Sequence, residues 1–262
     1  MSKTYFLLAM IGCIIVTISS CAKEKEETSD DAASSSSSSS SWCTEVSSCS
    51  ATPSGSITGV DNDTFSGVFS GFHVFGDNGT SGYDNTTDCV SNATMIANLK
   101  SQMGLPTGIN SLIMNNAVTS SSSFAERIYT YSDTSCSTEI TTVVFSYNLT
   151  VGDNVSGLNT SVGDRTYSST ATKVTYTQSC VALKASSDAG ATFLKTLLSG
   201  LSGIDPAVGT SYKCEATDSP KYALWSYRDN SSLSLSMLVE EKSSSAHPSG
   251  WSEDPDHMTF LP

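Results

Sequence analysis

The stretch Thr141-Thr142-Val143-Val144-Phe145-Ser146-Tyr147-Asn148-Leu149-Thr150 alternates cleanly along its length. One face of this stretch carries Val143, Phe145, Tyr147 and Leu149, and the other carries Val144, Ser146, Asn148 and Thr150. Successive side chains of a strand point to opposite faces of a sheet, so this pattern predicts a half-buried β-strand. The next four residues, Val151-Gly152-Asp153-Asn154, predict a turn.

Similar patterns recur on both sides of this stretch. Ser231–Glu240 repeats the alternation, with apolar side chains at Leu233, Leu235, Met237 and Val239. Four further segments are rich in Thr, Tyr, Val or Phe and are bounded by Gly, Asn and Asp, which predicts the strands Thr64–Phe75, Phe124–Tyr131, Thr172–Leu183 and Tyr222–Tyr227.

Two helices are predicted between the strands. The first is capped by Asn92, ends at Gly104 and Pro106, and carries its apolar face on Met95, Ile96, Leu99 and Met103. The second is capped by Asp188, ends near Gly200 or Gly203, and carries Phe193, Leu194, Leu197, Leu198 and Leu201.

Antiparallel strands with one or two covering helices predict a mainly β fold, either a curled sheet or a barrel. The segment Tyr129-Thr130-Tyr131-Ser132-Asp133-Thr134-Ser135-Cys136 ends a predicted strand in Tyr-x-Asp-x-x-Cys. With the strand and Gly-Asp turn that follow, it resembles the lipocalin-like barrel domains of exported bacterial proteins, over about residues 124–184. The Gly-x-Trp signature of true lipocalins is absent from the first predicted strand, so the resemblance implies a barrel and not a ligand.

The beginning of the sequence predicts export. Lys3 is followed by an apolar run from Tyr5 to Ile18, which is too short to span a membrane and fits a secretory signal. The run ends in Ile18-Ser19-Ser20-Cys21, which resembles the lipobox of bacterial lipoproteins. The resemblance implies a signal peptide over residues 1–20 and lipidation of Cys21 with acyl chains such as palmitate. An ordinary secretory signal is the alternative.

The lipidated residue would begin a tether over residues 21–42. Ala22–Asp31 is charged and polar, and Ser34–Ser41 consists of serine alone, so this segment cannot bury enough apolar surface to fold. A flexible coil of about 20 residues spans roughly 25 Å. Ala22 follows the lipidated cysteine, which by the lipoprotein sorting pattern favours the outer membrane. We therefore expect one β-rich domain, residues 43–262, anchored to the cell envelope through lipid.

Composition excludes several classes of protein. Ser (52) and Thr (30) make up 82 of the 262 residues, about 31 %, while 15 % are charged and 38 % hydrophobic, which argues against a coiled coil or a multispan membrane protein. The net charge of −13 argues against a nucleic-acid partner, because phosphate binding needs a concentrated basic face.

Six cysteines remain once Cys13 leaves with the signal and Cys21 is lipidated. An even number in an exported domain predicts three disulfides among Cys43, Cys49, Cys89, Cys136, Cys180 and Cys214. Their connectivity does not follow from the sequence, although Cys43–Cys49 and Cys180–Cys214 are plausible pairs. A zinc site is the competing interpretation, but the CxxC spacing typical of one is absent.

The sequence contains no motif that predicts catalysis or a cofactor. Gly-x-Ser-x-Gly and the nucleotide-binding glycine patterns are missing, and only three His are present. The tail Ala246–His257, which reads as an exposed loop, offers weak metal ligands in His247, Asp254, Asp256 and His257, with Glu253 close by. His73 alternates with Phe69 and Phe75 and is interpreted as a packed histidine. Asp61-Asn62-Asp63-Thr64 begins like a calcium loop but is interpreted as an Asx turn, because Phe65 takes a ligand position.

These observations favour a non-catalytic envelope lipoprotein with a binding or structural role. Its interior, lined by Val143, Phe145, Tyr147, Leu235 and Met237, would either hold a small apolar ligand or be a packed core, and we favour the packed core. The alternatives are a surface module that binds a host or envelope protein and, less favoured, a metal-dependent enzyme.

Overall fold

The computed structural model describes residues 43–45, 49–70, 89–103, 105–162, 165–198, 205–215, 220–230, 233–242, 246–252 and 256–261. The predicted signal, Cys21, the predicted tether and His73 lie outside this set. In the described part of the chain, no helix is both long enough and apolar enough to cross a membrane.

Two long strands, β7 (Glu139–Ser156) and β10 (Thr170–Ala185), pair along almost their whole length and form the central strand pair of the fold. The main sheet has ten strands in the order β1-β11-β10-β12-β13-β14-β4-β5-β6-β7. The other eight are β1 (Cys43–Glu45), β4 (Val68–Ser70), β5 (Ser111–Ser120), β6 (Ser123–Tyr131), β11 (Ser211–Glu215), β12 (Lys221–Asn230), β13 (Leu233–Lys242) and β14 (Asp256–Leu261). Two small hairpins lie outside this sheet, β2 (Ser56–Val60) with β3 (Asp63–Ser66), and β8 (Ser161–Val162) with β9 (Arg165–Thr166).

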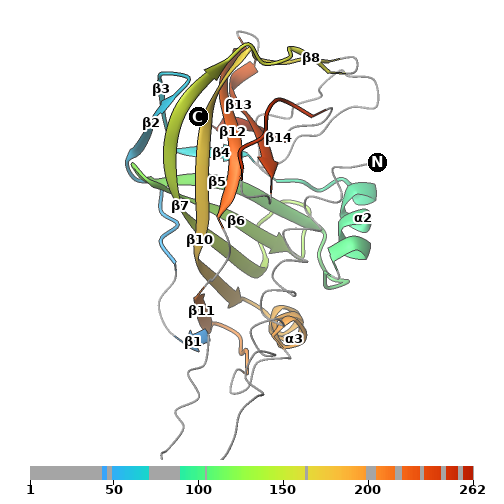
Figure 1. Ribbon diagram of the computed structural model, residues 1–262. Coiled ribbons are helices and arrows are strands. Elements are labelled where there is room, and N and C mark those ends of the chain that lie inside the picture. The colour runs from blue at the N-terminus through green and yellow to red at the C-terminus, as the bar shows by residue number, and fades with distance from the viewer. Residues whose placement is uncertain are drawn as a thin grey trace, which may run out of the picture.

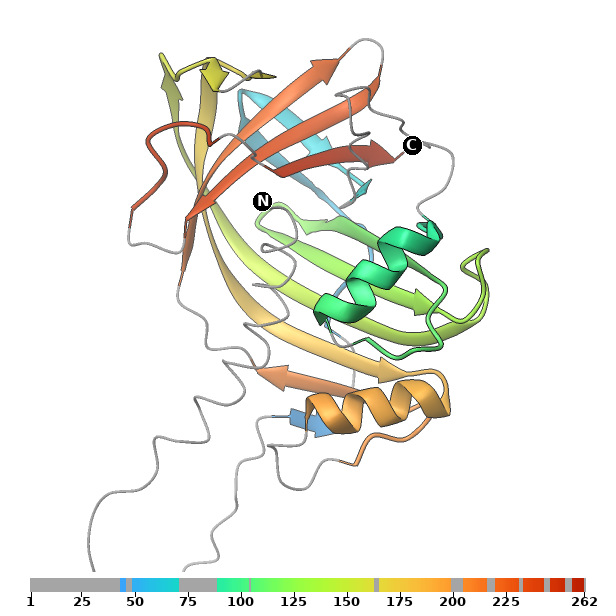
Figure 2. The ribbon, with the colours of Figure 1, turned by 90° about the vertical axis from the view of Figure 1, so that its right-hand side faces the viewer.

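The main sheet is strongly curled. All of its pairings are antiparallel, and β10 pairs with β7 on one edge and with β12 and β11 on the other. The order of pairing therefore leads from β7 through β6, β5, β4, β14, β13 and β12 back to β10. Figures 1 and 2 show the sheet bending around an interior, with β1, β11 and α3 at one end and β8 at the other. The predicted mainly β, antiparallel curled sheet with two helices is confirmed.

Most predicted strands are confirmed: four lie within β6, β7, β10 and β12, and the described part of Ser231–Glu240 lies in β13. The expected single strand Thr64–Phe75 is wrong within its described part, because Gly67 breaks it at a φ of 85°. The residues before Gly67 form β3 and pair with β2, whereas those after it form β4 and join the main sheet. Strand β5 is not predicted by the sequence pattern, because its polar Asn115-Asn116 pair interrupts the apolar alternation.

The strand at Thr141–Thr150 is buried on more than one face. Val143, Phe145, Tyr147 and Leu149 pack in the main core as predicted, and Asn148 and Thr150 are exposed. However, Val144 and Ser146 on the opposite face are buried too. The chain just after Cys49 lies over them, and the Ser146 hydroxyl donates a hydrogen bond to the Ser50 carbonyl over 3.1 Å. We call residues 49–51 the strap.

Both predicted helices are present, with one cap corrected. Helix α2 (Ala93–Met103) starts after Asn92, whose carbonyl accepts from the Ile96 amide over 2.9 Å. Helix α3 (Asp188–Leu197) is capped by Ser187 and not by Asp188, because the extended Ser187 accepts a hydrogen bond from the Gly190 amide. Gly190 lies so close to β7 that an added Cβ would be 2.2 Å from the Ile140 carbonyl oxygen.

The disulfides differ from the pairs that seemed plausible from spacing. Cys49 is bonded to Cys180, and Cys89 to Cys136. Cys214 is also disulfide-bonded, and Cys43 lies directly opposite it in the β1–β11 register. The pairs Cys43–Cys49 and Cys180–Cys214 are therefore wrong. The reason is the register of β10 and β11, where Cys214 faces Val181 and so lies on the opposite side of the sheet from Cys180.

Candidate functional site

The inner face of β5, β6, β7 and β10 is organised in four levels. Residues directly opposite one another in a sheet share a face, so the register stacks the side chains in belts. From the end nearest α3 these belts are Leu112/Thr130/Thr141/Ala185, then Met114/Ile128/Val143/Leu183, then Asn116/Glu126/Phe145/Val181, and last Val118/Phe124/Tyr147/Gln178. We call the third the central belt. It places an amide and a carboxylate between two largely apolar levels.

Glu126 and Asn116 of the central belt are buried polar side chains. Glu126 is 3 % exposed and Asn116 is 8 % exposed. Asn116 lies opposite Phe69 of β4 on its other side, and Glu126 lies opposite Phe145 of β7. Burying a polar group is costly unless it is hydrogen-bonded, and burying a charge is costly unless it is paired. Neither residue is among the predicted site residues, although Glu126 alternates in sequence with Phe124 and Ile128, which indicates that it shares their inward face.

Six rings form an aromatic cluster next to the central belt. Phe124 stacks on Tyr147 with ring centroids 4.8 Å apart, and Trp225 lies 5.6 Å from Phe124. The hairpin β2–β3 adds Phe65, which is 6.0 Å from Trp225. The full aromatic cluster is Phe65, Phe69, Phe124, Tyr147, Tyr176 and Trp225. Such edge and stacked contacts line this part of the interior with rigid apolar surface.

The indole nitrogen of Trp225 is an orphan donor inside this cluster. The Trp225 side chain is 2 % exposed, and its Nε1 has no hydrogen-bond partner among the residues that the structure describes. By contrast, Nε1 of Trp251 donates to the Ser168 carbonyl over 2.7 Å. An unsatisfied buried donor costs about 1–3 kcal/mol, and native proteins contain few of them. The sequence does not predict this property of Trp225, because burial without a hydrogen-bond partner depends on the tertiary structure.

The turn Asp61-Asn62 docks on the sheet. Both residues have positive φ, 51° and 65°, as expected of a tight hairpin turn between β2 and β3. The Ser226 hydroxyl donates to the Asp61 carboxylate over 2.7 Å, and the Asp61 amide donates to the Thr172 hydroxyl over 2.8 Å. The interpretation of this segment as a turn is confirmed. Its carboxylate anchors the hairpin that carries Phe65 into the interior.

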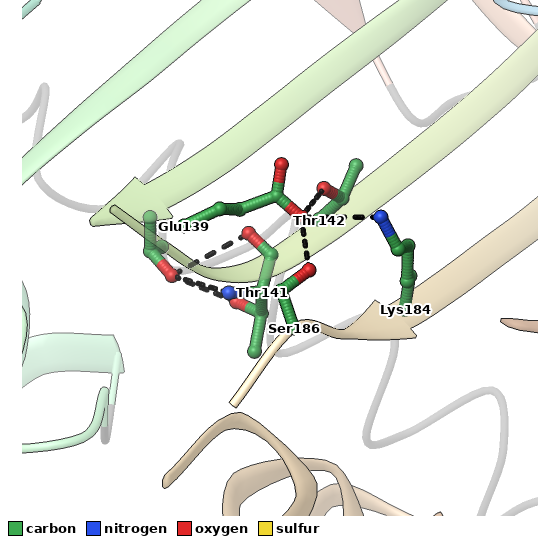
Figure 3. Close-up of polar contacts among 6 residues, drawn as sticks. Glu139, Thr141, Thr142, Lys184 and Ser186 are labelled. Carbon is green, nitrogen blue, oxygen red and sulfur yellow. Dashed lines mark hydrogen bonds and ion pairs between the residues drawn. The ribbon is translucent and has the colours of Figure 1, made fainter. Parts of the chain in front are cut away.

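A polar cluster surrounds Glu139 at the α3 end (Figure 3). Its carboxylate accepts hydrogen bonds from the Ser186 and Thr142 hydroxyls, and Lys184 Nζ lies 3.7 Å away. Lys184 is half exposed. This arrangement ties the end of β7 to the chain that enters α3, which is a structural role.

Asp133 organises the hairpin between β6 and β7. Its carboxylate accepts from the amides of Ser135, Ser137 and Thr138 and from the hydroxyls of Ser135 and Ser137. These donors hold the pKa of Asp133 well below its usual range, with the backbone hydrogen bond from Ser137 the largest cause. The Tyr-x-Asp-x-x-Cys pattern thus has a local explanation, since the same turn places Cys136 for its bond to Cys89.

His247 packs against the sheet. Its Nε2 lies 3.2 Å from the Thr175 hydroxyl, and its ring packs edge-on against Tyr222 at 5.2 Å. Burial, with a smaller contribution from Lys173, lowers the pKa of His247. The tail is not the expected exposed loop over its described part, because Pro248 and Trp251 are buried.

The remaining metal candidates are only partly placed. Asp256 and His257 lie on β14 with side chains outside the described set, and Glu253 and Asp254 are outside it altogether. Among the described residues, no group of three or more His, Cys, Asp or Glu could hold a metal ion.

Two comparisons with known proteins identify no family for this chain. No protein-family model matches the chain, and no curated protein matches it.

Proposed function

We propose that this protein is a lipid-anchored, non-catalytic binding protein of a bacterial cell envelope, and that the interior of its curled sheet binds a small, mainly apolar molecule. The single observation that carries the binding role is the buried Nε1 of Trp225 in the aromatic cluster, which has no hydrogen-bond partner among the described residues. A core that serves packing alone gains nothing from an unpaired donor, whereas a binding site needs a few polar groups in an apolar setting.

The central belt supports the same proposal. Asn116 and Glu126 are buried on the face that also carries Phe124 and Tyr147. Small-molecule sites are typically apolar and aromatic with a small number of placed polar groups, and this interior has that composition.

The proposed location rests on the sequence. The lipobox-like Ile18-Ser19-Ser20-Cys21 and the serine-rich residues 34–41 support a lipid anchor followed by a tether, and Ala22 favours the outer membrane. More than one acyl chain gives stable anchoring. Incorporation of labelled palmitate into the full chain, and its loss in Cys21→Ala, is the expected result. Equal labelling of both proteins would exclude Cys21 as the lipidation site.

Native mass spectrometry tests the binding role. The full-length protein is extracted in detergent from its own host, and its mass is compared under native and denaturing conditions. Covalent acyl chains contribute equally to both masses, so a native excess of a few hundred daltons identifies a non-covalently bound molecule. Identical masses, together with no binding of the neutral fluorescent probe N-phenyl-1-naphthylamine, would refute the proposal and favour the fully packed core.

A further inference from the structure

We infer that the bound molecule is an uncharged, planar compound whose carbonyl oxygen accepts a hydrogen bond from Trp225 Nε1. This inference rests on the proposed function, and it adds the chemical class of the ligand.

The hydrogen-bonding chemistry of Trp225 requires an acceptor. An indole Nε1–H donates and cannot accept, so only an oxygen or nitrogen lone pair satisfies it. Trp251 shows the same group in its satisfied form, donating to a backbone carbonyl over 2.7 Å. An acceptor of the same kind on a ligand would remove the cost of the orphan donor of Trp225.

The surroundings of Trp225 favour a flat molecule. Phe65, Phe124 and Tyr176 lie 6.0, 5.6 and 6.1 Å from its ring centroid, with interplanar angles of 53°, 68° and 49°. Rings tilted in this way present both faces and edges to a neighbour, and aromatic systems pair best through such offset and edge contacts. A conjugated, planar body is the shape that gains most from this lining.

The four belts offer no cationic side chain to an anionic acceptor. The central belt contains the carboxylate of Glu126, and none of the sixteen residues in the four belts is Lys or Arg. Arg127, the residue next to Glu126, lies on the opposite face, where it donates to the Ala51 carbonyl over 3.1 Å. A buried carboxylate on the ligand would therefore lack a described cationic partner, which is costly at low dielectric. A neutral carbonyl avoids this cost.

Two neutral naphthalene probes isolate the carbonyl. One is prodan, 6-propionyl-2-dimethylaminonaphthalene, and the other is its analogue in which a methylene group replaces the carbonyl. Each is titrated into the full-length protein and followed by probe fluorescence. A net hydrogen bond of about 0.5–1.5 kcal/mol corresponds to about two- to twelvefold in Kd, so prodan should bind tighter than the methylene analogue by that factor.

Matched variants assign the preference to Trp225. Trp225→Phe keeps an aromatic ring but removes the donor, and it should reduce the ratio of the two Kd values to about one, whatever the smaller ring does to the affinity for each probe. Trp251→Phe removes an indole whose donor is already paired, and it should leave both affinities unchanged. Because the prodan preference is first measured in the unaltered protein, the inference can be tested even if Trp225→Phe fails to fold.

The outcomes separate the two proposals. If both probes bind the unaltered protein with equal affinity, or if Trp225→Phe retains the preference, the inferred carbonyl ligand is wrong while interior binding stands. If neither probe binds, the inferred planar carbonyl ligand is wrong, and the native mass comparison then decides separately whether the proposed binding function fails as well. The anionic counterpart 6-dimethylamino-2-naphthoate should bind at least tenfold more weakly than prodan, and tighter binding of the naphthoate would overturn the inference that the ligand is neutral.

Discussion

Removing the disulfide Cys49–Cys180 should be the most damaging change at the outer face of the sheet. The bond closes a loop with a sequence separation of 131 residues. In the chain-entropy model, ΔS is about −2.1 − 1.5R ln n cal/mol/K, which corresponds to about 5 kcal/mol at 25 °C for n = 131. Cys89–Cys136 lies within this loop and shortens it by 47 residues, to 84, which reduces the stabilisation to about 4.5 kcal/mol.

The bond also holds the strap against the sheet. Cys49 and Cys180 pack with Ala125, Val144 and Ala182 in a small core on the outer face. Without the disulfide, the strap is held mainly by the hydrogen bonds from Ser146 to Ser50 and from Arg127 to Ala51. Together the two bonds contribute about 2 kcal/mol net, which is less than the roughly 3–6 kcal/mol that ordering the backbone of three residues costs. The strap should therefore detach in Cys49→Ala/Cys180→Ala.

Urea unfolding followed by far-UV circular dichroism, under non-oxidising and non-reducing conditions, measures the loss. The double variant should lose about 4–5 kcal/mol of unfolding free energy by linear extrapolation. The control, Cys89→Ala/Cys136→Ala, opens a loop of separation 47 and should lose about 4 kcal/mol without freeing the strap. Limited proteolysis distinguishes them, because only the first variant should be cleaved within residues 49–55. A loss below 1 kcal/mol, or equal cleavage of both variants, would refute this reasoning.

Three smaller predictions concern single residues. Gly190→Ala should cost about 3 kcal/mol in urea unfolding, because its Cβ would be 2.2 Å from the Ile140 carbonyl oxygen, whereas Gly108→Ala, with nothing within 4 Å, should change stability by less than about 0.5 kcal/mol. Asp133→Asn should be less stable than wild type at pH 7, and the gap should narrow as pH falls below about 4, because the folded carboxyl has a lowered pKa and its stabilisation is lost on protonation; a gap independent of pH would contradict this. The folded pKa of His247 is also lowered, so protonation favours unfolding, and wild type should lose stability relative to His247→Gln as pH falls below about 6.5 in thermal melts. Parallel pH profiles would show that His247 titrates freely.

The sequence predicts a helix or strand correctly where the whole pattern lies within one segment of the chain. The alternation at Thr141–Thr150 identified β7, and the spacing of Ile96 and its apolar neighbours identified α2. These predictions succeeded because period and capping are properties of a single segment. The cap of α3 was misplaced by one residue, because Ser187 and Asp188 are both good caps and only the backbone distinguishes them.

The sequence does not predict which distant segments of the chain contact one another. Cys180 and Cys214 looked like a brace across a helix, but their register places them on opposite sides of the sheet. The burial of Val144 and Ser146 depends on a strap almost a hundred residues away in sequence. Likewise, the sequence shows that Glu126 shares a strand face with apolar residues. It does not show that the curl of the sheet encloses that face.

The sequence by itself determined the class of the fold, the positions of most strands and the expectation of an exported, lipid-tethered domain, because each depends on composition or on a periodic pattern within one segment. Only the tertiary structure decided which cysteines meet, which strand faces are covered and that Trp225 is buried with no hydrogen-bond partner in the part of the chain that the structure describes. The physical reason is that burial and hydrogen-bond satisfaction depend on what packs against a side chain. In a curled antiparallel sheet those neighbours come from strands far apart in the chain.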